Sequence, residues 1–188
     1  HQLFKKKLTA LNGDFKISYY DSNNSYISTK PINLNKINKK KWFDSKKIEY
    51  FYAYANKAVL FKTAENFDGG ILKGLDSNFP SHNLETYLIE GRFLDKTDSE
   101  SLEIIISSQT SEKLDLKVGD FINSFFYDFS KSKFPKKRTF KVVGIFNSGF
   151  VDFDKNFSFT NLEVLQRING WDKDEVGGIE LILKNQFK

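Results

Sequence analysis

The hydrophobic positions of this chain recur mostly at a spacing of two, which is typical of β-strands. The clearest run is KKIEYFYAYANKAVLFKT (46–63), and GGILKGLD (69–76) is predicted to be a short strand that a Gly-Gly turn opens. Strand composition continues in LEIIISS (102–108), FINSFF (121–126) and RTFKVVGIF (138–146). The middle of the chain is therefore predicted to be mostly β-structure.

Helical spacing is confined to short segments. A helix over 3–12 is predicted to end at Asn12-Gly13, before an alternating strand at 15–19. Further helices are predicted after Pro31, between LEIIISS and the turn at Gly119-Asp120, and over NLEVLQRI (161–168). With a closing strand in VGGIELILKN, this pattern predicts an α+β fold.

Composition limits the kind of protein. The chain has 188 residues, which suits one domain or two small lobes, and its 39% hydrophobic content is too high for a disordered chain. The absence of cysteine excludes disulfides, thiolate metal sites and thiol nucleophiles. No apolar run is long enough to cross a membrane as a helix.

The net charge of +5 is unevenly distributed. Residues 1–47 carry +8, 48–126 carry −6, 127–141 carry +5 and 142–188 carry −2. A uniformly basic nucleic-acid-binding protein would not show this pattern, so we predict no nucleic-acid partner.

One of the basic segments lies between two β-prone runs. If FINSFF and RTFKVVGIF pair as a hairpin (121–146), the hairpin carries its charge at the tip. The candidate partner-binding residues are Phe134, Pro135, Lys131, Lys133, Lys136, Lys137 and Arg138. An exposed Phe134 would anchor a partner and the cations would attract an acidic one. The alternative is an ordinary hairpin that folds back with Phe134 packed.

The segment 152–163 imitates a calcium-binding loop, with oxygen-bearing side chains at positions 1, 3, 5, 7, 9 and 12. Its sixth position is Phe157, where such loops need glycine. We therefore predict a strand with Phe153, Phe157 and Phe159 on one face, followed by a helix that a Thr160–Glu163 capping box opens. No metal or other cofactor is predicted.

Catalytic patterns are weak. Ser148, in FNSGF, lacks the first glycine of a nucleophile elbow, and His82 lies in a loop rich in Pro, Ser and Asn. The carboxylates Glu100 and Glu103 are predicted to lie on a solvated face, and those at 172–175 in a turn. No phosphate-binding glycine loop is present. We predict no catalytic residue, and expect any ATPase activity on a separate subunit.

The last third of the chain, from FKVVGIF to VGGIELILKN, resembles the periplasmic domain of FtsX-like ABC transporter permeases, with a MacB-like core. The likeness is greatest to the lipoprotein-releasing permeases of the LolC and LolE type. The matching positions are Val143, Gly144, Phe146, Gly149, Asp152, Asp154, Leu162, Gln166, Gly178, Ile179 and Glu180. Looser likenesses in the same order cover nearly the whole chain.

The resemblance implies two lobes. A βαβ-rich porter lobe would be built from both chain ends (1–70 and 147–188), and a β-rich sabre lobe (71–146) would be inserted between them with the projecting hairpin. In this family the domain is looped between the first and second of four transmembrane helices. We therefore expect this chain to be one part of a longer membrane protein, at the periplasmic face of a Gram-negative inner membrane. The first strand resembles Bacteroidetes-type versions.

The resemblance also implies a function. In the lipoprotein-releasing branch one permease extends a β-hairpin hook that holds the periplasmic lipoprotein carrier, and residues 127–139 fall at that place, although the hook sequence itself is not matched. The expected partners are an ABC ATPase subunit, a second permease subunit, and a carrier or adaptor. The alternatives are a macrolide-exporter-type efflux permease, whose domain works with an adaptor, and a secreted module that binds polyanions or glycans.

Overall fold

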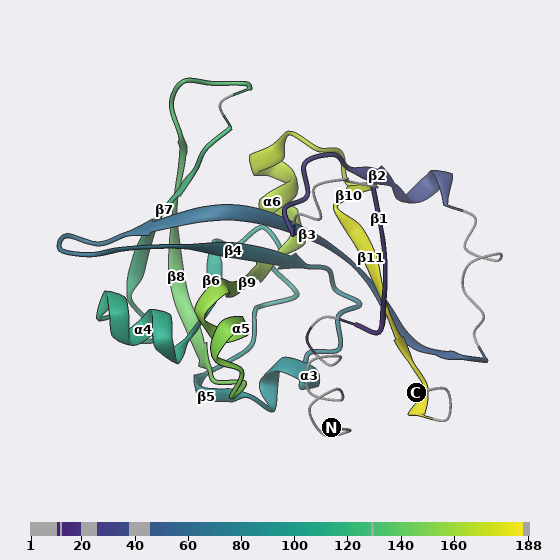
Figure 1. The fold of residues 1–188 in the computed structure, drawn as a ribbon, viewed down its shortest axis with the longest axis horizontal. Helices are drawn as coiled ribbons and strands as arrows, with labels where there is room; N and C mark the ends of the chain where they lie inside the picture. Colours follow the sequence, from purple (N-terminus) through teal and green to yellow (C-terminus); the bar gives the residue numbers. More distant parts are fainter. Residues whose placement is uncertain (1–10, 12, 20–25, 38–45, 129, 186–188) are drawn as a thin grey trace.

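The structure is a computed structural model that describes the chain except for residues 1–10, 12, 20–25, 38–45, 129 and 186–188 (Figure 1). The predicted helix over 3–12, apart from Leu11, and the second part of the predicted basic helix after Pro31 lie outside the described residues. The strands are β1 (Phe15–Ser18), β2 (Ile32–Asn33), β3 (Ile48–Lys62), β4 (Phe67–Leu75), β5 (Leu88–Gly91), β6 (Glu103–Ser107), β7 (Phe121–Phe126), β8 (Lys136–Phe146), β9 (Phe157–Asn161), β10 (Glu175–Val176) and β11 (Gly178–Leu183). The helices are η1 (Leu34–Lys36), α3 (His82–Glu85), α4 (Ser108–Leu114), α5 (Val151–Asn156) and α6 (Leu162–Asn169).

One nine-stranded sheet organises these elements, in the order β1-β11-β3-β4-β9-β6-β8-β5. β7 lies off this path and pairs with both β3 and β8. The pairings β3-β4-β9-β6-β8-β7 therefore return to β3 and close a ring of six strands. The mixed sheet and the few short helices agree with the predicted α+β class.

The interior of this ring holds the first of two apolar clusters. Alternate residues of its strands point inward, as the period of two requires, and they pack with apolar residues of α6. This cluster includes Val59, Phe61, Leu72, Ile104, Ile106, Ile122, Phe126, Phe140, Val142, Leu165 and Ile168. A second cluster joins β3, β6, β8, β9 and β11 to α3 and α5 through Tyr52, Phe79, Leu84, Ile105, Phe146, Phe153, Phe159 and Ile182, among others.

The strand prediction for 46–63 is confirmed by β3, but the Gly-Gly turn prediction is wrong. Gly69 and Gly70 lie inside β4, opposite Leu60 and Val59, and the chain reverses at 63–66 instead. Gly70 is needed because a Cβ there would lie 2.8 Å from the backbone oxygen of Asn156. The pair therefore allows close packing rather than a reversal.

The strand prediction for the segment around Phe153 is also wrong. Residues 151–156 form α5, where Phe153 stacks on Phe157 with ring centroids 4.7 Å apart. The capping box is not formed either, because the Thr160 hydroxyl donates to the Glu103 carbonyl oxygen, and Asn161 is the N-cap of α6. The aromatic side chains cluster as predicted, but Phe153 reaches the cluster from a helix, whereas Phe157 and Phe159 reach it from β9.

The basic helix predicted after Pro31 is wrong in its described part, where β2 is followed only by the single 3-10 turn η1. The helix predicted before Gly119 is confirmed as α4, and Gly119 itself takes a positive φ of 98°. In the parts of the chain that the structure describes, no helix is long and apolar enough to cross a membrane. Strands from both predicted lobes share the nine-stranded sheet, and the division into two lobes stays a prediction.

Candidate functional site

The predicted hairpin is formed by β7 and β8, which pair antiparallel from Phe121–Lys141 to Phe126–Lys136. Ile122 and Phe126 face the interior of the ring and are buried, whereas Phe121 is 66% exposed on the outer side. The described connecting residues, 127–128 and 130–135, extend away from the body of the sheet, at the top of Figure 1. The strands therefore belong to the core and the tip stands outside it.

The aromatic residue at this tip is not packed in the core. Phe134 is 79% exposed, and its backbone N–H donates to Ser132 Oγ at 3.1 Å. Pro135 beside it is half-buried, directly before the first residue of β8. An exposed phenylalanine on a loop that is fixed by a proline and a local hydrogen bond is suited to contact another molecule.

The cations of the tip differ in what their side chains contact. Lys136 Nζ donates to the carbonyl oxygen of Ile168 at 2.6 Å, and Lys131 Nζ donates to that of Asn169 at 3.4 Å. Both carbonyls lie at the carboxyl end of α6. Lys133 and Lys137 are exposed, and within the described part of the chain their side chains have no hydrogen-bond or ion-pair partner. Arg138 is half-buried and donates to the Lys137 carbonyl oxygen at 2.8 Å.

Two further residues shape the charge of the tip. Asp128 accepts a 2.5 Å hydrogen bond from the Ser130 hydroxyl and lies 3.7 Å from Lys131; these neighbours hold the pKa of its carboxyl below the usual value. Lys57, from β3, donates to Asn169 Oδ1 at 2.6 Å. Burial lowers the pKa of Lys57, with further contributions from Lys136 and Lys131. Lys57 is not among the residues predicted for the site, although it is the only charged residue between Tyr50 and Phe61 in the sequence.

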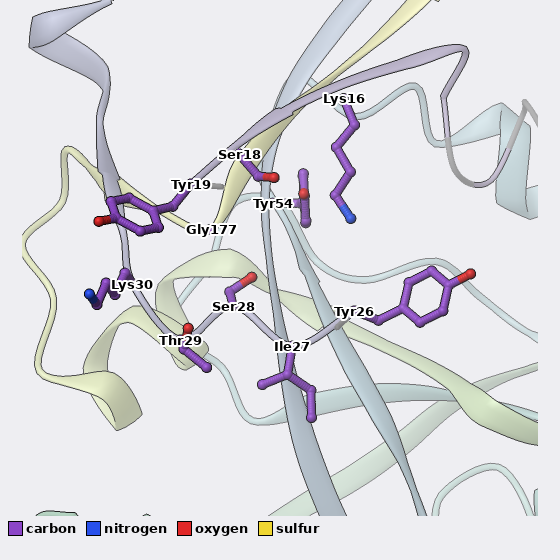
Figure 2. A pocket seen from close by; sticks show the side chains of 10 residues that line it. All are labelled: Lys16, Ser18, Tyr19, Tyr26, Ile27, Ser28, Thr29, Lys30, Tyr54 and Gly177. Carbon is purple, nitrogen blue, oxygen red and sulfur yellow. The ribbon is translucent and has the colours of Figure 1, made fainter. Parts of the chain in front are cut away.

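A small polar cavity between β1, β3 and residues 26–30 is a second candidate (Figure 2). The Lys16 ammonium lies 5.0 Å from the ring centroid of Tyr54 and 5.8 Å from that of Tyr26. Burial lowers the pKa of Lys16, although Glu180 opposes this effect. At about 30 Å³ the cavity holds little more than a water molecule, far below the volume of a small-molecule site.

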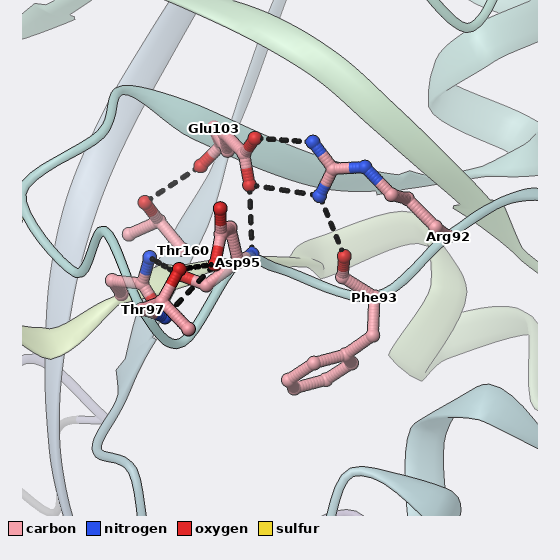
Figure 3. A network of polar contacts seen from close by, with 7 residues as sticks. Arg92, Phe93, Asp95, Thr97, Glu103 and Thr160 are labelled. Atoms are coloured by element: carbon pink, nitrogen blue, oxygen red, sulfur yellow. Dashed lines mark hydrogen bonds and ion pairs between the residues drawn. The ribbon is translucent and has the colours of Figure 1, made fainter.

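The third candidate is the ion pair between Arg92 and Glu103 (Figure 3). Glu103 accepts hydrogen bonds from both terminal nitrogens of Arg92, at 2.5 and 3.1 Å, and from the backbone N–H of Asp95 at 2.9 Å. Burial opposes the charge of Glu103, but these bonds outweigh it and lower its pKa. The prediction that Glu103 is solvated is wrong, because it is 7% exposed and fixes residues 92–95 to β6.

Ser148 and His82, the residues considered for catalysis, do not form a common site. The buried Ser148 donates its hydroxyl to Asp154 Oδ1 at 2.5 Å and so shapes the turn before α5. His82 is exposed and begins the short helix α3 rather than lying in a loop, with its ring 5.9 Å from that of Tyr50. Neither residue is set up to activate the other, and the hairpin tip remains the strongest candidate.

Comparisons with known proteins bear on the class of protein and on the fold. No family model matches the chain. In sequence it is 26% identical over 166 residues to the lipoprotein-releasing system transmembrane protein LolC of Buchnera aphidicola subsp. Schizaphis graminum. The aligned region covers 86% of this chain and 41% of that protein. The chain thus spans about two fifths of the length of the relative it matches.

Solved structures decide the fold. The extracellular domain of the noncanonic ABC-type transporter YknZ from Gram-positive bacteria superposes with a TM-score of 0.59 and 16% identity, over 90% of this chain and 83% of that one. The periplasmic region of MacB from Actinobacillus actinomycetemcomitans gives a TM-score of 0.59 and 11% identity, over 96% and 80%. The chain has the MacB-type periplasmic fold. The MacB-like fold that the sequence resemblance implies is thereby confirmed, and it accounts for the mixed sheet with a few short helices.

Proposed function

We propose that this chain is the extracytoplasmic domain of an ABC transporter permease of the lipoprotein-releasing type. The domain itself catalyses nothing. It couples ATP hydrolysis, on a separate cytoplasmic subunit, to the release of a lipid-modified protein and to its transfer to a periplasmic carrier. The permease works with a second permease subunit at the periplasmic face of a bacterial inner membrane.

The observation that carries this proposal is the exposed hairpin tip. Sequence similarity to LolC and the MacB-type fold support the class of protein. An exposed Phe134 on a +5 segment supports a protein-binding hook. Aromatic anchors give most of the binding energy at such contacts, and surrounding charges raise the association rate. We therefore assign anchoring to Phe134 and Pro135, and attraction of an acidic carrier to the surrounding Lys and Arg side chains.

The test is a binding measurement between this domain and the periplasmic lipoprotein carrier of the same organism. Phe134→Asp should weaken binding at least 30-fold, about 2 kcal/mol. The double variant Lys133→Glu/Lys137→Glu should slow association and make it less sensitive to salt. Phe67→Asp is a matched control, because Phe67 is also exposed (69%) but lies at the other hairpin. Wild-type affinity in the Phe134 variant would overturn the proposal.

A second candidate is a macrolide-exporter-type permease, which the fold match to the MacB region favours. In that case the domain would bind a periplasmic adaptor instead of a carrier. A direct comparison separates the two: the same domain is immobilised and offered the carrier and the adaptor in turn. Saturable binding of the adaptor, with none of the carrier, would decide for the exporter.

A further inference from the structure

The carboxyl end of α6 is where three lysines from two separate parts of the chain meet. Lys131 and Lys136 reach it from the hairpin tip, and Lys57 reaches it from the middle of β3. The acceptors are the carbonyl oxygens of Ile168 and Asn169 and the side-chain oxygen of Asn169. The tip therefore extends beyond the ring of strands, and on one side it is hydrogen-bonded to the end of α6.

Helix geometry explains why these carbonyls accept bonds from side chains. The last four carbonyl oxygens of a helix have no partner within the helix. At the end of α6, Gly170 takes a φ of +68°, so that the backbone N–H groups of Gly170 and Trp171 donate to Arg167 and Gln166. Ile168 and Asn169 are the next two residues, and the hairpin lysines donate to their carbonyl oxygens. The partial negative charge of a helix carboxyl end favours these cations.

The electrostatic repulsion among the three lysines is reduced by a nearby carboxylate. Asp128 lies 3.7 Å from Lys131 and its charge partly offsets the repulsion among the lysines. The junction is closely packed, since only about 20 Å³ of space remains between the hairpin tip, Lys57 and Ile168, enough for about one water molecule. The contact therefore consists of several cooperating bonds and is not a single surface ion pair.

We propose that Lys131 and Lys136 are positioning residues that fasten the hairpin tip to the carboxyl end of α6, so that the tip moves together with α6. Lys57 is a third positioning residue, because it binds Asn169 and so holds this end of α6 against β3. Partner recognition is then left to Lys133, Phe134, Pro135 and Lys137. This second step rests on the proposed function; the fastening does not. The sequence had assigned all the tip lysines to the partner, and the structure divides them by what they contact.

The fastening can be measured without any partner. The chain has no cysteine, so Phe134→Cys and Lys173→Cys provide two unique sites for spin labels, one on the tip and one just after α6. The distance distribution between the labels is measured by pulsed electron paramagnetic resonance in three backgrounds. These are the otherwise unchanged chain, Lys131→Gln/Lys136→Gln, and Lys133→Gln/Lys137→Gln. Each double substitution removes two positive charges, one from the connecting loop and one from the start of β8.

We expect Lys131→Gln/Lys136→Gln to broaden the distribution at least twofold, because the tip then moves independently of α6. Lys133→Gln/Lys137→Gln should leave the width unchanged. If both double variants match the unchanged chain, the fastening does not exist and the proposal is overturned. The same follows if both broaden it equally, since charge alone would then be responsible.

Binding to the carrier, measured on unlabelled protein, tests the second step. Lys133→Gln/Lys137→Gln should slow association without altering the distance distribution. Lys131→Gln/Lys136→Gln should lower affinity about tenfold, because the tip must be ordered on binding, and Lys57→Gln should lower it in the same direction. If the carrier binds none of the proteins, the proposed function fails while the distance result still decides the fastening.

Discussion

At the residue scale, the most unusual side chain is Lys73, which is fully buried in β4. Its ammonium lies 2.8 Å from both carboxylate oxygens of Glu180 in β11 and 3.2 Å from the carbonyl oxygen of Leu11. The Tyr52 hydroxyl also donates to Glu180. Burial, together with Glu180, raises the pKa of Tyr52 well above its usual value, so the phenol keeps its proton. The Lys73–Glu180 pair therefore connects residues near both ends of the described chain, Leu11 and Glu180, to β4 in the middle of the sheet.

Replacing one member of this pair should be costly. Lys73→Met leaves the buried Glu180 carboxylate without its cation, and the free energy of unfolding should fall by about 3–5 kcal/mol. Lys113→Met is the control, because its ion pair with Asp68 involves a lysine that is 56% exposed and should matter by less than about 1 kcal/mol. Urea unfolding measures both. Similar losses in the two variants would show that burial of the pair is unimportant.

The second residue-scale prediction concerns Asp76, which follows β4. Burial raises the pKa of Asp76 to about 6, against hydrogen bonds from the backbone N–H groups of Ala53 and Asn78. Since the folded state holds the proton more tightly, this contribution to stability is complete below about pH 3.8 and is lost as the pH rises through about 6. The loss should amount to roughly 2–3 kcal/mol.

The check is a pair of stability profiles from pH 4 to pH 8. The difference in unfolding free energy between the wild type and Asp76→Asn should change across this range in favour of Asp76→Asn as the pH rises. A constant offset between the two profiles would mean that the pKa of Asp76 is the same in both states. Taking the difference removes the contributions of the other titrating groups, which the two proteins share.

At the element scale, β5 lies against β8 at a distance that only glycine permits. Gly91 has a φ of +80°, and a Cβ there would lie 2.1 Å from the Val143 carbonyl oxygen. Gly91→Ala should therefore destabilise the protein by about 2 kcal/mol or more. Gly69→Ala, inside β4 with nothing within 4 Å, should cost nothing or stabilise slightly. Thermal unfolding of the two variants checks this, and equal midpoints would contradict it.

Strands could be predicted from the sequence where the period of two is long. β3, β7 and β8 follow directly from their alternating residues, as does the hairpin that joins β7 to β8. The failures came where spacing is ambiguous. The apolar positions of 151–159 fit one face of a strand, yet the first half is α5, because two or three aromatic residues do not separate the two periods. Tertiary packing decides such segments.

The site was only half predictable for a similar reason. Phe134 and the lysines stand out in the sequence by their type and by their position between two strands. Nothing local indicates that Lys131 and Lys136 meet α6, which lies about thirty residues further along the chain. That contact depends on β7 pairing with both β3 and β8, which brings the hairpin beside Lys57. Long-range pairing of this kind cannot be derived from a single sequence.

At the scale of the whole molecule, the closed ring separates stability from recognition. The apolar cluster inside the ring includes Ile122 and Phe126 at the base of the hairpin, while the described residues of the tip (127–128 and 130–135) add nothing to it except at the junction with α6. A binding loop on a rigid scaffold can vary without unfolding its domain. The tip should therefore be removable.

Replacing residues 127–135 by Asn-Gly tests this separation. The last pair of the ladder, Phe126 with Lys136, would then be joined by a two-residue turn of the kind that suits antiparallel strands. We expect the free energy of unfolding to change by less than about 1 kcal/mol, because the removed residues are mostly exposed. Carrier binding should be lost entirely.

The matched control replaces the β3–β4 turn, residues 63–66, by the same Asn-Gly pair, which shortens the other projecting hairpin. That variant should fold and still bind the carrier with unchanged affinity. Circular dichroism and urea unfolding establish the folded state of both variants, and calorimetric titration measures binding. Unfolding of the first variant would show that the tip stabilises the ring, and retained binding would place the partner elsewhere on the domain.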